Sequence, residues 1–530
     1  MLGDEAVALG ALYAGLSGVY AYPGTPSTEI TEFIQQSPLA QERGVRSRWC
    51  TNEKTAMEAA LGMSYAGKRA LVCMKHVGMN VCADAFVNAA ITGVKGGLVV
   101  LAADDPSMHS SQNEQDSRFY GKFAMVPIFE PSCQQEAFDM VADAFALSES
   151  LRLPVLMRVV TRLAHSRAAV QIGDPLPQNA FSPDDERTRW VLLPGNAKRQ
   201  YAALIGKQEE ILAGSEASGY NRMEILRSAQ DDKRGLGVIA AGIGYNYVRE
   251  VLPAGVAVLK ISQYPLPAKQ VRELAARCSR ILVVEDGQPF VEEQVRALLG
   301  PDYPVQGRLS GELPRTGELT PDCVAASLGM AGAAPHAPAL HLAARPPQLC
   351  QGCGHRDVYA ALNRVVAEFP GARVFGDIGC YTLGALPPFR AIDSTVDMGA
   401  SITMAKGAAD AGLRPAIAVI GDSTFTHSGM TGLLDAVNDH AAITVVISDN
   451  LTTAMTGGQD SAGTHKYEAI CLALGVEREH LHVVVPLPAN MEEITRILRE
   501  EIAYEGVSVI IPQRECMQTL GRKLRQKKQQ

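Results

Sequence analysis

The chain has 530 residues, of which 47% are hydrophobic, and carries a formal net charge of −8 with a sequence pI near 5.8. This length predicts several domains, and the negative charge argues against nucleic acid as the main partner. The N-terminus is apolar but contains Asp4 and Glu5 and lacks a basic start, and no run of about 18 apolar residues occurs. We therefore expect a cytoplasmic protein without a cleaved signal or a membrane span. Eleven cysteines indicate reduced thiols or metal ligands, not a disulfide scaffold.

The first 185 residues alternate helix-like and strand-like segments. Helical spacing runs from Glu5 to Leu16, and GVYAYPGTPS has the character of a strand that ends in a tight turn before a helix at Thr28. An Ala-rich helix begins near Glu53, and the apolar segments RALVCMK, GGLVVLAADD and PVLMRVV follow as strands. Strands that alternate with helices predict a doubly wound parallel sheet and the α/β class.

The rest of the chain divides by composition. Residues 186–232 follow a Pro- and Asp-rich run and are expected to form an irregular linker with some helical packing. Residues 233–320 have the pattern of a smaller α/β domain; its GIGYN turn fits helix–strand packing about as well as phosphate binding. An Ala/Pro-rich linker is expected at 321–345, a further α/β domain at 346–520, and a solvated basic tail without regular structure at 521–530.

The stretch from Gly421 to Gln459 has the strongest chemical signal. PAIAVI and AITVVIS are apolar runs of strand type, and the segment between them has helical spacing, which predicts a β-α-β unit. Asp422 follows the first strand and Asn450 the second, so both are expected at the carboxyl edge of a parallel sheet, where such sheets bind ligands. A carboxylate and an amide at that edge, together with backbone carbonyls and diphosphate oxygens, form a Mg²⁺ site.

Two details extend this interpretation. Gly457 and Gly458 allow a phosphate to approach the backbone closely. The order of residues is similar to the thiamine diphosphate motif, in which GDG is followed at a distance by NN, with Ser423 and Asp449 as variants here. The alternative is an ordinary β-α-β unit with an aspartate in a turn.

Four cysteines occupy turns or strand ends near the same region. Cys350 and Cys353 form a C-x₂-C pair, Cys380 ends the strand-like run FGDIGC, and Cys516 follows another strand-like run. Four thiolates suit an iron–sulfur cluster or a structural zinc ion. A third interpretation is that only the C-x₂-C pair has a function and the other two are buried apolar thiols.

Glu53 is the candidate for a catalytic carboxylate. Thiamine chemistry needs a carboxylate beside N1′ of the aminopyrimidine, where it stabilises the imino tautomer that removes the C2 proton. Acidic residues at helix starts are also common because of the helix dipole. Lys75 and His76, and the turn that contains Thr25, follow strands and are candidates for holding a substrate carboxylate, with local turn hydrogen bonds as the alternative.

Together these stretches resemble the 2-oxoacid:ferredoxin oxidoreductases, and among them the alpha subunits of the indolepyruvate ferredoxin oxidoreductase type. The matching stretches run in order along nearly all of residues 1–516: YPGTPSTEI, TNEKTAMEAALG, MKHVGMNV, ADDPSMHSSQNEQD, CQGCGH, GDIGCYTLG, DMGASI, GDS with DN, and TAMTGGQ. The resemblance implies a multi-domain thiamine diphosphate-binding fold. Its parts are a pyrimidine-binding domain at 1–185, a transketolase C-terminal-like domain at 233–320 and a diphosphate-binding domain at 346–520.

The resemblance also implies residue roles. Glu53 becomes the activating glutamate, and Asp422, Asn450 and Thr452 become the Mg²⁺ ligands. Cys350, Cys353, Cys380 and Cys516 become the ligands of a [4Fe–4S] cluster near thiamine, which favours the cluster over zinc. The remaining cofactor-binding residues by this likeness are Thr25, His355, Gly399, Ser401, Gly421, Ser423 and Gly457.

The implied activity is oxidative decarboxylation of an arylpyruvate-type 2-oxoacid to its acyl-CoA, with electrons leaving through the cluster to ferredoxin or a similar carrier. Coenzyme A, a smaller beta subunit and an oligomeric assembly are expected with it. The alternatives are a thiamine-dependent decarboxylase or lyase without redox chemistry, and a non-catalytic subunit. One departure is that the resembling proteins usually continue into a ferredoxin-like tail with two four-cysteine runs, whereas no cysteine follows Cys516 here. We therefore expect one cluster in this polypeptide.

Overall fold

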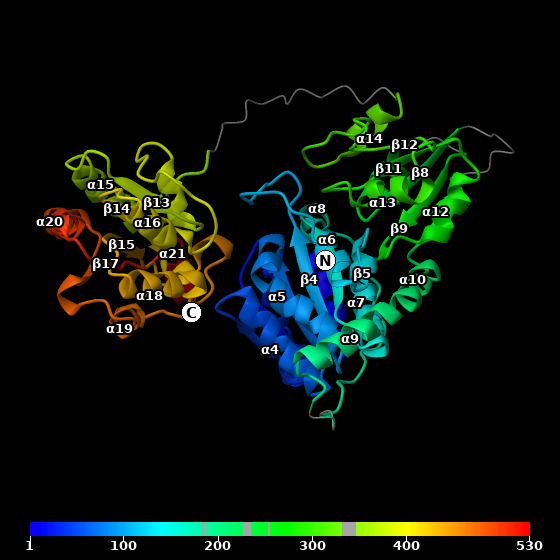
Figure 1. The fold of residues 1–530 in the computed structure, drawn as a ribbon, viewed down its shortest axis with the longest axis horizontal. Coiled ribbons are helices and arrows are strands. Elements are labelled where there is room, and N and C mark those ends of the chain that lie inside the picture. The colour runs from blue at the N-terminus through cyan, green and yellow to red at the C-terminus, as the bar shows by residue number, and fades with distance from the viewer. Residues whose placement is uncertain (183–185, 187, 226–234, 253–254, 331–345, 530) are drawn as a thin grey trace. The chain divides into compact units, whose positions relative to one another are not determined.

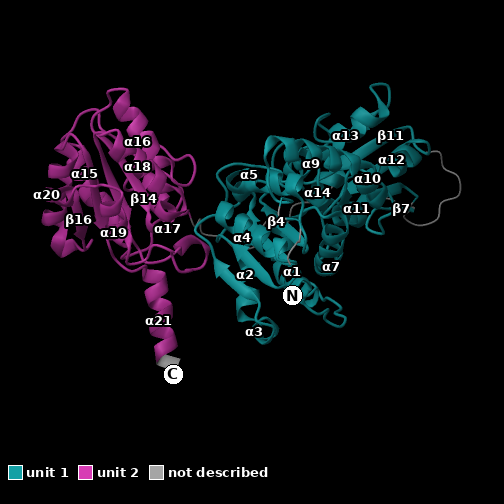
Figure 2. Cartoon of the chain, turned by 60° about the horizontal axis from the view of Figure 1, so that its bottom comes forward, with its two compact units in different colours: residues 1–337 teal, residues 338–530 magenta. Residues whose placement is uncertain are grey.

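The computed structural model describes residues 1–182, 186, 188–225, 235–252, 255–330 and 346–529. The chain separates into two compact units, residues 1–337 and 338–530, which Figure 2 colours teal and magenta. Each unit is built around parallel β-sheet, as the alternating pattern predicts. Within the described residues, no helix combines the length and the apolarity that crossing a membrane requires.

The first sheet of unit 1 has, in its described part, seven strands in the order β10–β5–β6–β4–β3–β1–β2. Neighbours are parallel except for β10 and β5. The three central strands are buried along their whole length, which is typical of a sheet covered on both faces. The strands are β1 (Gly18–Ala21), β2 (Arg46–Trp49), β3 (Ala70–Lys75), β4 (Leu98–Asp104), β5 (Ile128–Phe129), β6 (Val155–Val160) and β10 (Gln263–Tyr264).

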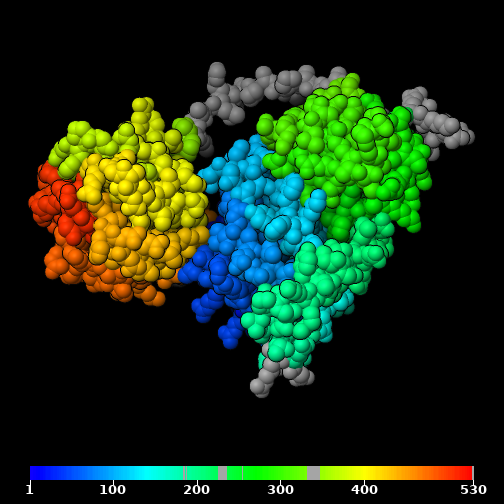
Figure 3. Space-filling model, viewed as in Figure 1, coloured from blue at the N-terminus to red at the C-terminus, as the bar shows by residue number. Residues whose placement is uncertain are grey.

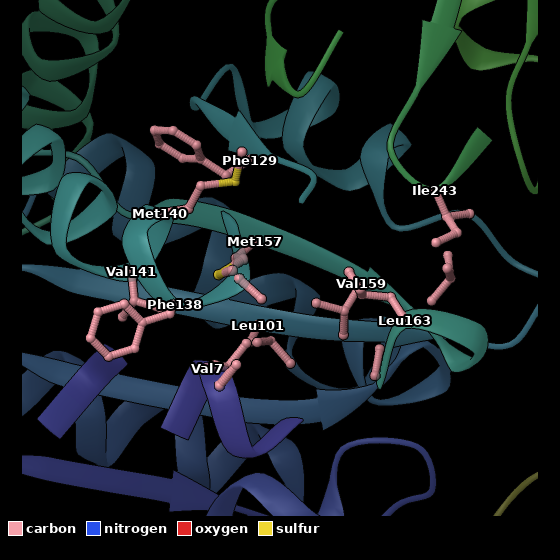
Figure 4. Close-up of a cluster of buried hydrophobic side chains, with 14 of the residues drawn as sticks. Val7, Leu101, Phe129, Phe138, Met140, Val141, Met157, Val159, Leu163 and Ile243 are labelled. Atoms are coloured by element: carbon pink, nitrogen blue, oxygen red, sulfur yellow. The ribbon is translucent and has the colours of Figure 1, made fainter. Parts of the chain in front are cut away.

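Helices cover both faces of this sheet (Figure 1). Alternate strand residues point to opposite sides, so Leu101 and Met157 pack with Val7 and Phe138 from two helices on one face (Figure 4), whereas Val100 packs on the other. The first face is covered by α1 (Gly3–Tyr13), α2 (Thr28–Gln36) and α7 (Gln134–Leu151), and the second by α4 (Glu53–Tyr65) and α5 (His76–Thr92). Three shorter helices complete this part: α3 (Pro38–Glu42), α6 (Arg118–Ala124) and α8 (Thr161–His165).

A second sheet in unit 1 has the order β12–β11–β8–β9–β7 over the described residues, and only β7 is antiparallel to its neighbour. Figure 3 shows its green residues directly beside cyan residues of the first sheet, consistent with the pairing of β10 with β5. Its strands are β7 (Arg222–Ile225), β8 (Leu236–Ala241), β9 (Ala257–Ile261), β11 (Arg280–Val284) and β12 (Val305–Gln306). Its helices are α11 (Gly244–Val251), α12 (Ala268–Ala275), α13 (Phe290–Leu299) and α14 (Pro321–Ser327).

Regular structure extends into residues 186–232, where we expected an irregular segment. Helices α9 (Pro194–Gly206) and α10 (Gln208–Glu216) lie there, and β7 adds an edge strand to the second sheet. Helices α9 and α10 have mostly exposed polar residues and only a weak apolar stripe. Among their apolar side chains, only Leu204 and Ile211 are deeply buried. In the linker expected at 321–345, residues 321–327 form α14, and residues 331–345 lie outside the described residues.

Unit 2 contains a sheet whose described strands, all parallel, have the order β13–β14–β15–β17–β16. The strands are β13 (Arg373–Gly376), β14 (Ala416–Gly421), β15 (Ile443–Ser448), β16 (Leu481–Val484) and β17 (Val507–Pro512). One face carries α16 (Ala400–Asp410), α18 (Met430–Asn438) and α19 (Tyr467–Ala473), and the other α15 (Gly354–Val366) and α20 (Met491–Ala503).

One local prediction for unit 2 needs correction. The basic tail, expected to lack regular structure, belongs to helix α21 (Met517–Gln529). Its Lys- and Arg-rich sequence consists of good helix formers, which outweigh the absence of an apolar face.

The helical segment predicted between the two strands of the β-α-β unit is present as α18. A short α17 (Asp422–Thr424) and a π-turn at Phe425–Gly429 precede it.

A fully buried ionic cluster connects the two sheets of unit 1. Arg158, on β6, donates to Asp104 (2.5 Å) and to Glu130, and also to the backbone carbonyl of Asp286 at 2.9 Å. Arg118 contacts Asp116, Glu130 and Glu285, and none of the six residues of this cluster is more than 4% exposed. Burying so many charges is favourable only while every partner remains in place.

We predict that Arg158→Met lowers the free energy of unfolding of unit 1 by about 3–5 kcal/mol, because it leaves buried carboxylates without a counter-charge. The matched control is Arg162→Met, whose ion pair with Glu318 is half exposed on the arginine side and should be worth less than about 1 kcal/mol. Urea unfolding followed by tryptophan fluorescence reports on unit 1 alone, since both tryptophans, Trp49 and Trp190, belong to it. Equal effects of the two substitutions would contradict the prediction.

Candidate functional site

The site in unit 2 begins where two neighbouring strands end together. Strands β14 and β15 are parallel, and Gly421 lies opposite Ser448 in their register. The next residue in each strand is an aspartate, so Asp422 and Asp449 lie side by side at the carboxyl edge of the sheet. Both side chains are buried, with 2% exposure each. This is the position in which open parallel sheets bind ligands.

The two carboxylates form an environment that favours a cation. The carboxylate of Asp422 accepts hydrogen bonds from the backbone N–H groups of Ser423 (2.7 Å) and Thr452 (3.2 Å). Even so, burial and then the neighbouring Asp449 carboxylate raise the pKa of Asp422 well above its usual value. A divalent cation would offset the like-charge repulsion, and the oxygen-only ligands are those that Mg²⁺ prefers. The residues present therefore fit a bound magnesium ion.

Asn450 and Thr452 surround the same point. The Asn450 side-chain oxygen accepts a hydrogen bond from the Thr452 backbone N–H (3.2 Å), and the Thr452 hydroxyl donates to the Gln459 carbonyl (3.0 Å). Both residues are buried. The following loop closes with positive φ angles of 135° at Gly457 and 94° at Gly458, a backbone shape that glycine adopts without strain.

Sequence reasoning missed Asp377, which follows strand β13 at the same edge. It is fully buried, and burial raises its pKa to about 7 against the hydrogen bonds that it accepts from Ser401. The Ser401 hydroxyl donates to Asp377 at 2.6 Å, and Tyr381 also contacts this carboxylate. The hydroxyl of Ser401, a predicted cofactor-binding residue, thus makes a hydrogen bond within the protein. The signal was available, because GDIG repeats the strand-end pattern of GDS.

Glycines 399 and 421, also predicted at the cofactor, occupy crowded positions. A Cβ atom on Gly421 would lie 2.5 Å from the Tyr381 ring, and one on Gly399 would lie 2.6 Å from the Ser428 side chain. Gly399 also has a φ of 93° and immediately precedes helix α16. Because Gly399 has no side chain, the N-terminus of α16 can face the edge of the sheet. Packing alone therefore explains glycine at both positions, whatever else they bind.

The four predicted cysteines line one cavity of about 200 Å³ in unit 2. They come from three places in the chain: Cys350 and Cys353 from the start of α15, Cys380 from the turn after β13, and Cys516 from the start of α21. All four face this cavity, which their spacing in the sequence could only suggest. His355, Asp449 and Asn450 line the same cavity. The cysteine cavity therefore adjoins the carboxylate edge directly.

The spacing of the sulfur atoms distinguishes two kinds of metal group. Zn–S bonds of about 2.3 Å place the sulfurs of a tetrahedral zinc site about 3.8 Å apart. Among the described residues, no three of these cysteine sulfurs lie within 4.8 Å of one another. In their present side-chain positions the sulfurs are thus not gathered at zinc-ligand spacing, and four thiolates are also the ligand set of an iron–sulfur cluster.

His355 joins the cysteines to the carboxylate edge. Its Nε2 lies 3.2 Å from the Cys380 sulfur and 3.5 Å from the Asn450 side-chain nitrogen, which itself lies 3.5 Å from that sulfur. Burial lowers the pKa of His355 to about 4, so the imidazole is neutral at physiological pH. Burial, and then Cys353, raise the pKa of the Cys380 thiol, which a bound metal would reverse.

In unit 1, Glu53 occupies a tight position at the start of α4. The side chain is 4% exposed, and its helix begins with Asn52 accepting a hydrogen bond from the Thr55 N–H at 2.9 Å. A Cβ atom on Gly78 of α5 would lie 2.8 Å from a Glu53 carboxylate oxygen. Because residue 78 is glycine, the backbone of α5 packs directly against the Glu53 carboxylate and restricts its orientation.

The turn around Thr25 and the side chain of Lys75 come together at neighbouring strand ends. Gly24 packs on Lys75, since a Cβ there would be 3.0 Å from the Lys75 Cβ. The Lys75 ammonium donates to the Ser110 carbonyl (2.7 Å), and burial lowers its pKa to about 8. His76 points to a different partner, the Asn113 carbonyl at 3.3 Å, and within the described structure its buried Nδ1 has no hydrogen-bond partner. Lys75 and His76 thus contact different residues of the run His109–Arg118.

Comparisons with known proteins agree with this arrangement. Residues 9–217 match the family model "Pyruvate flavodoxin/ferredoxin oxidoreductase, thiamine diP-bdg", and residues 377–511 match "Thiamine pyrophosphate enzyme, C-terminal TPP binding domain". The first match contains Glu53 and Lys75, and the second contains Asp422 and Asn450. The predicted α/β thiamine diphosphate-binding fold is confirmed.

Relatives with a common name cover nearly the whole chain. The "Indolepyruvate oxidoreductase subunit IorA" of Archaeoglobus fulgidus is 39% identical over 97% of this chain and 86% of its own length. The proteins of the same name from Methanothermobacter thermautotrophicus and Thermococcus kodakarensis are 38% and 36% identical, over 98% and 97% of this chain and 87% and 85% of theirs. The chain therefore belongs to the IorA family of indolepyruvate oxidoreductase subunits, which are alpha-type subunits of thiamine diphosphate-dependent 2-oxoacid:ferredoxin oxidoreductases.

Proposed function

We propose that the protein oxidatively decarboxylates an arylpyruvate-type 2-oxoacid, similar to indolepyruvate, and passes the electrons through a [4Fe–4S] cluster. The 2-oxoacid anion and coenzyme A give the acyl-CoA, CO₂, one proton and two electrons, and the electrons go to ferredoxin or a similar carrier. The substrate follows from the names of the relatives. The redox part follows from the cysteine cavity.

The observation that carries the proposal is the contact of Asn450 and His355 with Cys380. Asn450 is a predicted Mg²⁺ ligand, and Cys380 is a predicted cluster ligand. With both groups bound, the side chain of Asn450 would lie between them within unit 2, and such proximity suits electron transfer from the cofactor to a cluster. A thiamine-dependent decarboxylase or lyase without redox chemistry has no use for four cysteines at this position.

Each residue near the carboxylate edge has a role in this proposal. When bound, thiamine diphosphate supplies the electron sink for cleavage of the bond to the carboxylate. Asp422, Asn450 and Thr452 hold the Mg²⁺ ion that neutralises the diphosphate, and Ser423 and Gly457 offer backbone groups to it. His355, neutral because it is buried, donates or accepts a hydrogen bond without adding charge beside the cysteine thiolates.

Unit 1 supplies the acid–base and substrate-binding groups. Glu53 holds a proton at N1′ of the aminopyrimidine, and its fixed direction against Gly78 suits that task. Lys75, in its protonated form below a pKa of about 8, pairs with the substrate carboxylate, and His76 offers its unpartnered Nδ1 as an acceptor. Thr25 belongs to the turn that packs on Lys75 and lines the same strand ends.

The protein is expected to act as part of a larger assembly. The relatives are named as subunits, so we propose a smaller beta subunit and an oligomeric enzyme. We also propose that the three sheets correspond to a pyrimidine-binding domain, a transketolase C-terminal-like domain and a diphosphate-binding domain, in that order. Electrons leaving the cysteine cavity then pass to a docked carrier or to centres held by a partner.

We predict that Glu53→Gln keeps thiamine diphosphate binding but lowers turnover by about 10²–10⁴-fold, because an amide cannot exchange the proton at N1′. Glu58→Gln is the matched control, since it lies on the same helix with a half-exposed side chain. Turnover is measured as substrate-dependent reduction of a dye under anaerobic conditions. Near wild-type turnover in Glu53→Gln would show that another residue performs this step.

We predict that Asp422→Asn abolishes the Mg²⁺ dependence of thiamine diphosphate binding and weakens that binding, while the cofactor-free protein becomes more stable. The amide keeps the size of the side chain but removes the repulsion with Asp449. Calorimetric titration with and without Mg²⁺ measures the first effect, and thermal unfolding the second. Asp435→Asn, on the exposed side of α18, is the control. Unchanged Mg²⁺-dependent binding would exclude Asp422 as a ligand.

We predict about four iron atoms per chain after anaerobic preparation, as one [4Fe–4S] cluster needs. Cys380→Ala should lose most of this iron and its substrate-dependent oxidation, whereas Cys471→Ala, a buried thiol away from the cavity, should keep both. Iron and zinc are measured together by elemental analysis. One zinc and no iron, or iron that survives Cys380→Ala, would contradict the cluster.

A further inference from the structure

A carboxylate near the N-terminus is buried without a hydrogen-bond partner among the described residues. Asp4, in the first turn of α1, is fully buried, and among the described residues neither of its carboxylate oxygens makes a hydrogen bond. A charged carboxylate in this state is unfavourable, so it either takes up a proton or acquires a compensating ligand. The acidic character of this position was visible in the sequence, but its burial was not.

Two further ligand-type side chains point to the same place. A carboxylate oxygen of Glu29 and a ring nitrogen of His165 lie, together with an oxygen of Asp4, all within 4.8 Å of one another. In the described structure this is the only such group of three formed by histidine, cysteine, aspartate and glutamate side chains. Imidazole with two carboxylates is a common ligand set for divalent transition metals.

The distance between Glu29 and His165 is informative. Oε1 of Glu29 and Nε2 of His165 are 3.7 Å apart, which is longer than a normal hydrogen bond. Two ligands bound to one zinc ion at about 2.0–2.1 Å in tetrahedral geometry lie about 3.3 Å apart. The pair is therefore closer to the spacing of two ligands on a shared cation than to that of a direct hydrogen bond.

The backbone builds this site from three helices of unit 1. Asp4 comes from α1, Glu29 from the first turn of α2, and His165 is the last residue of α8. A Cβ atom on Gly3 would lie 2.2 Å from the Leu163 carbonyl, so glycine lets the start of α1 lie directly on α8. The side chains of Glu29 and His165 are 38% and 36% exposed, which leaves a path for a cation and for a water ligand.

Charge balance favours a positive occupant. Burial, and then Glu29, raise the pKa of Asp4 well above its usual value, whereas His165 lowers the pKa of Glu29. His165 supplies at most one positive charge for two carboxylates. A proton shared between Asp4 and Glu29 is the competing explanation, and it makes a different experimental prediction.

We propose that Asp4, Glu29 and His165 bind a divalent transition-metal cation, with water completing its coordination. The ion would fasten the first turns of α1 and α2 to the end of α8. Helix α2 begins directly after the turn that contains Thr25, so an ion that fixes the start of α2 would also restrict the movement of this turn. The site is separate from the Mg²⁺ and cysteine positions, which belong to unit 2, and it does not depend on the proposed reaction.

Zinc uptake by the full chain tests the proposal. The protein is loaded anaerobically with its iron, Mg²⁺ and thiamine diphosphate, equilibrated with buffered Zn²⁺, and analysed for metals. Wild type should bind one Zn²⁺ per chain more than Asp4→Asn and His165→Gln. The matched control, His109→Gln, removes a histidine of unit 1 that pairs with one carboxylate, Glu318, and should keep the wild-type amount.

Thermal unfolding of the same proteins, followed by tryptophan fluorescence, gives a second measurement. Zn²⁺ should raise the Tm of wild type and of His109→Gln and leave that of Asp4→Asn unchanged. The Asp4→Asn variant removes a buried charge and should fold without metal, so loss of binding cannot be mistaken for loss of structure. Equal zinc contents in wild type and both site variants, with no shift in Tm, would overturn the proposal in favour of a shared proton.

Discussion

The two buried carboxylates at the ends of β14 and β15 are the constraint on which the account of unit 2 depends. Parallel register brings Asp422 and Asp449 together, and the covered sheet excludes the water that would otherwise screen them. Such a pair is unfavourable without a cation, which explains why the surrounding backbone N–H groups point at Asp422. Stability and function conflict here, because the fold holds a buried carboxylate pair whose repulsion a bound cation would offset.

Unit 1 also buries charged side chains, but there they are paired with one another. Its Arg118 and Arg158 are fully buried, but each has several carboxylate partners, so the protein itself supplies their counter-charges. This network fixes the second sheet against the first through backbone carbonyls of residues 286 and 288. The sheet that carries Lys75 and the Thr25 turn is thereby held on a rigid framework, which suits the substrate-binding role proposed for these residues.

Local signals in the sequence predicted much of this architecture. Strands β3, β4, β14 and β15 are continuous apolar runs, and each is followed by a polar residue, so their buried positions and the placement of Asp422 and Asn450 followed from pattern alone. The four cysteines were also identified, although 136 residues separate Cys380 from Cys516 and only the fold brings them to one cavity.

What the sequence could not provide depends on long-range packing. Asp4 and His165 are 161 positions apart, and nothing local distinguishes either from an ordinary surface residue. Arg118 lies in a polar run yet is fully buried, because Glu130 and Glu285 from two other segments pair with it. Helices α9 and α21 were missed for a different reason: they bury little apolar surface, so the periodicity that reveals a helix is weak.

A crystal structure of the anaerobically prepared protein with Mg²⁺ and thiamine diphosphate, including anomalous diffraction at the iron edge, tests the central claim most directly. The account predicts a metal ion between the diphosphate and Asp422, Asn450 and Thr452, and an iron peak in the cavity lined by the four cysteines. A diphosphate bound away from the ends of β14 and β15, or a cavity without iron in protein that still oxidises its substrate, would contradict it.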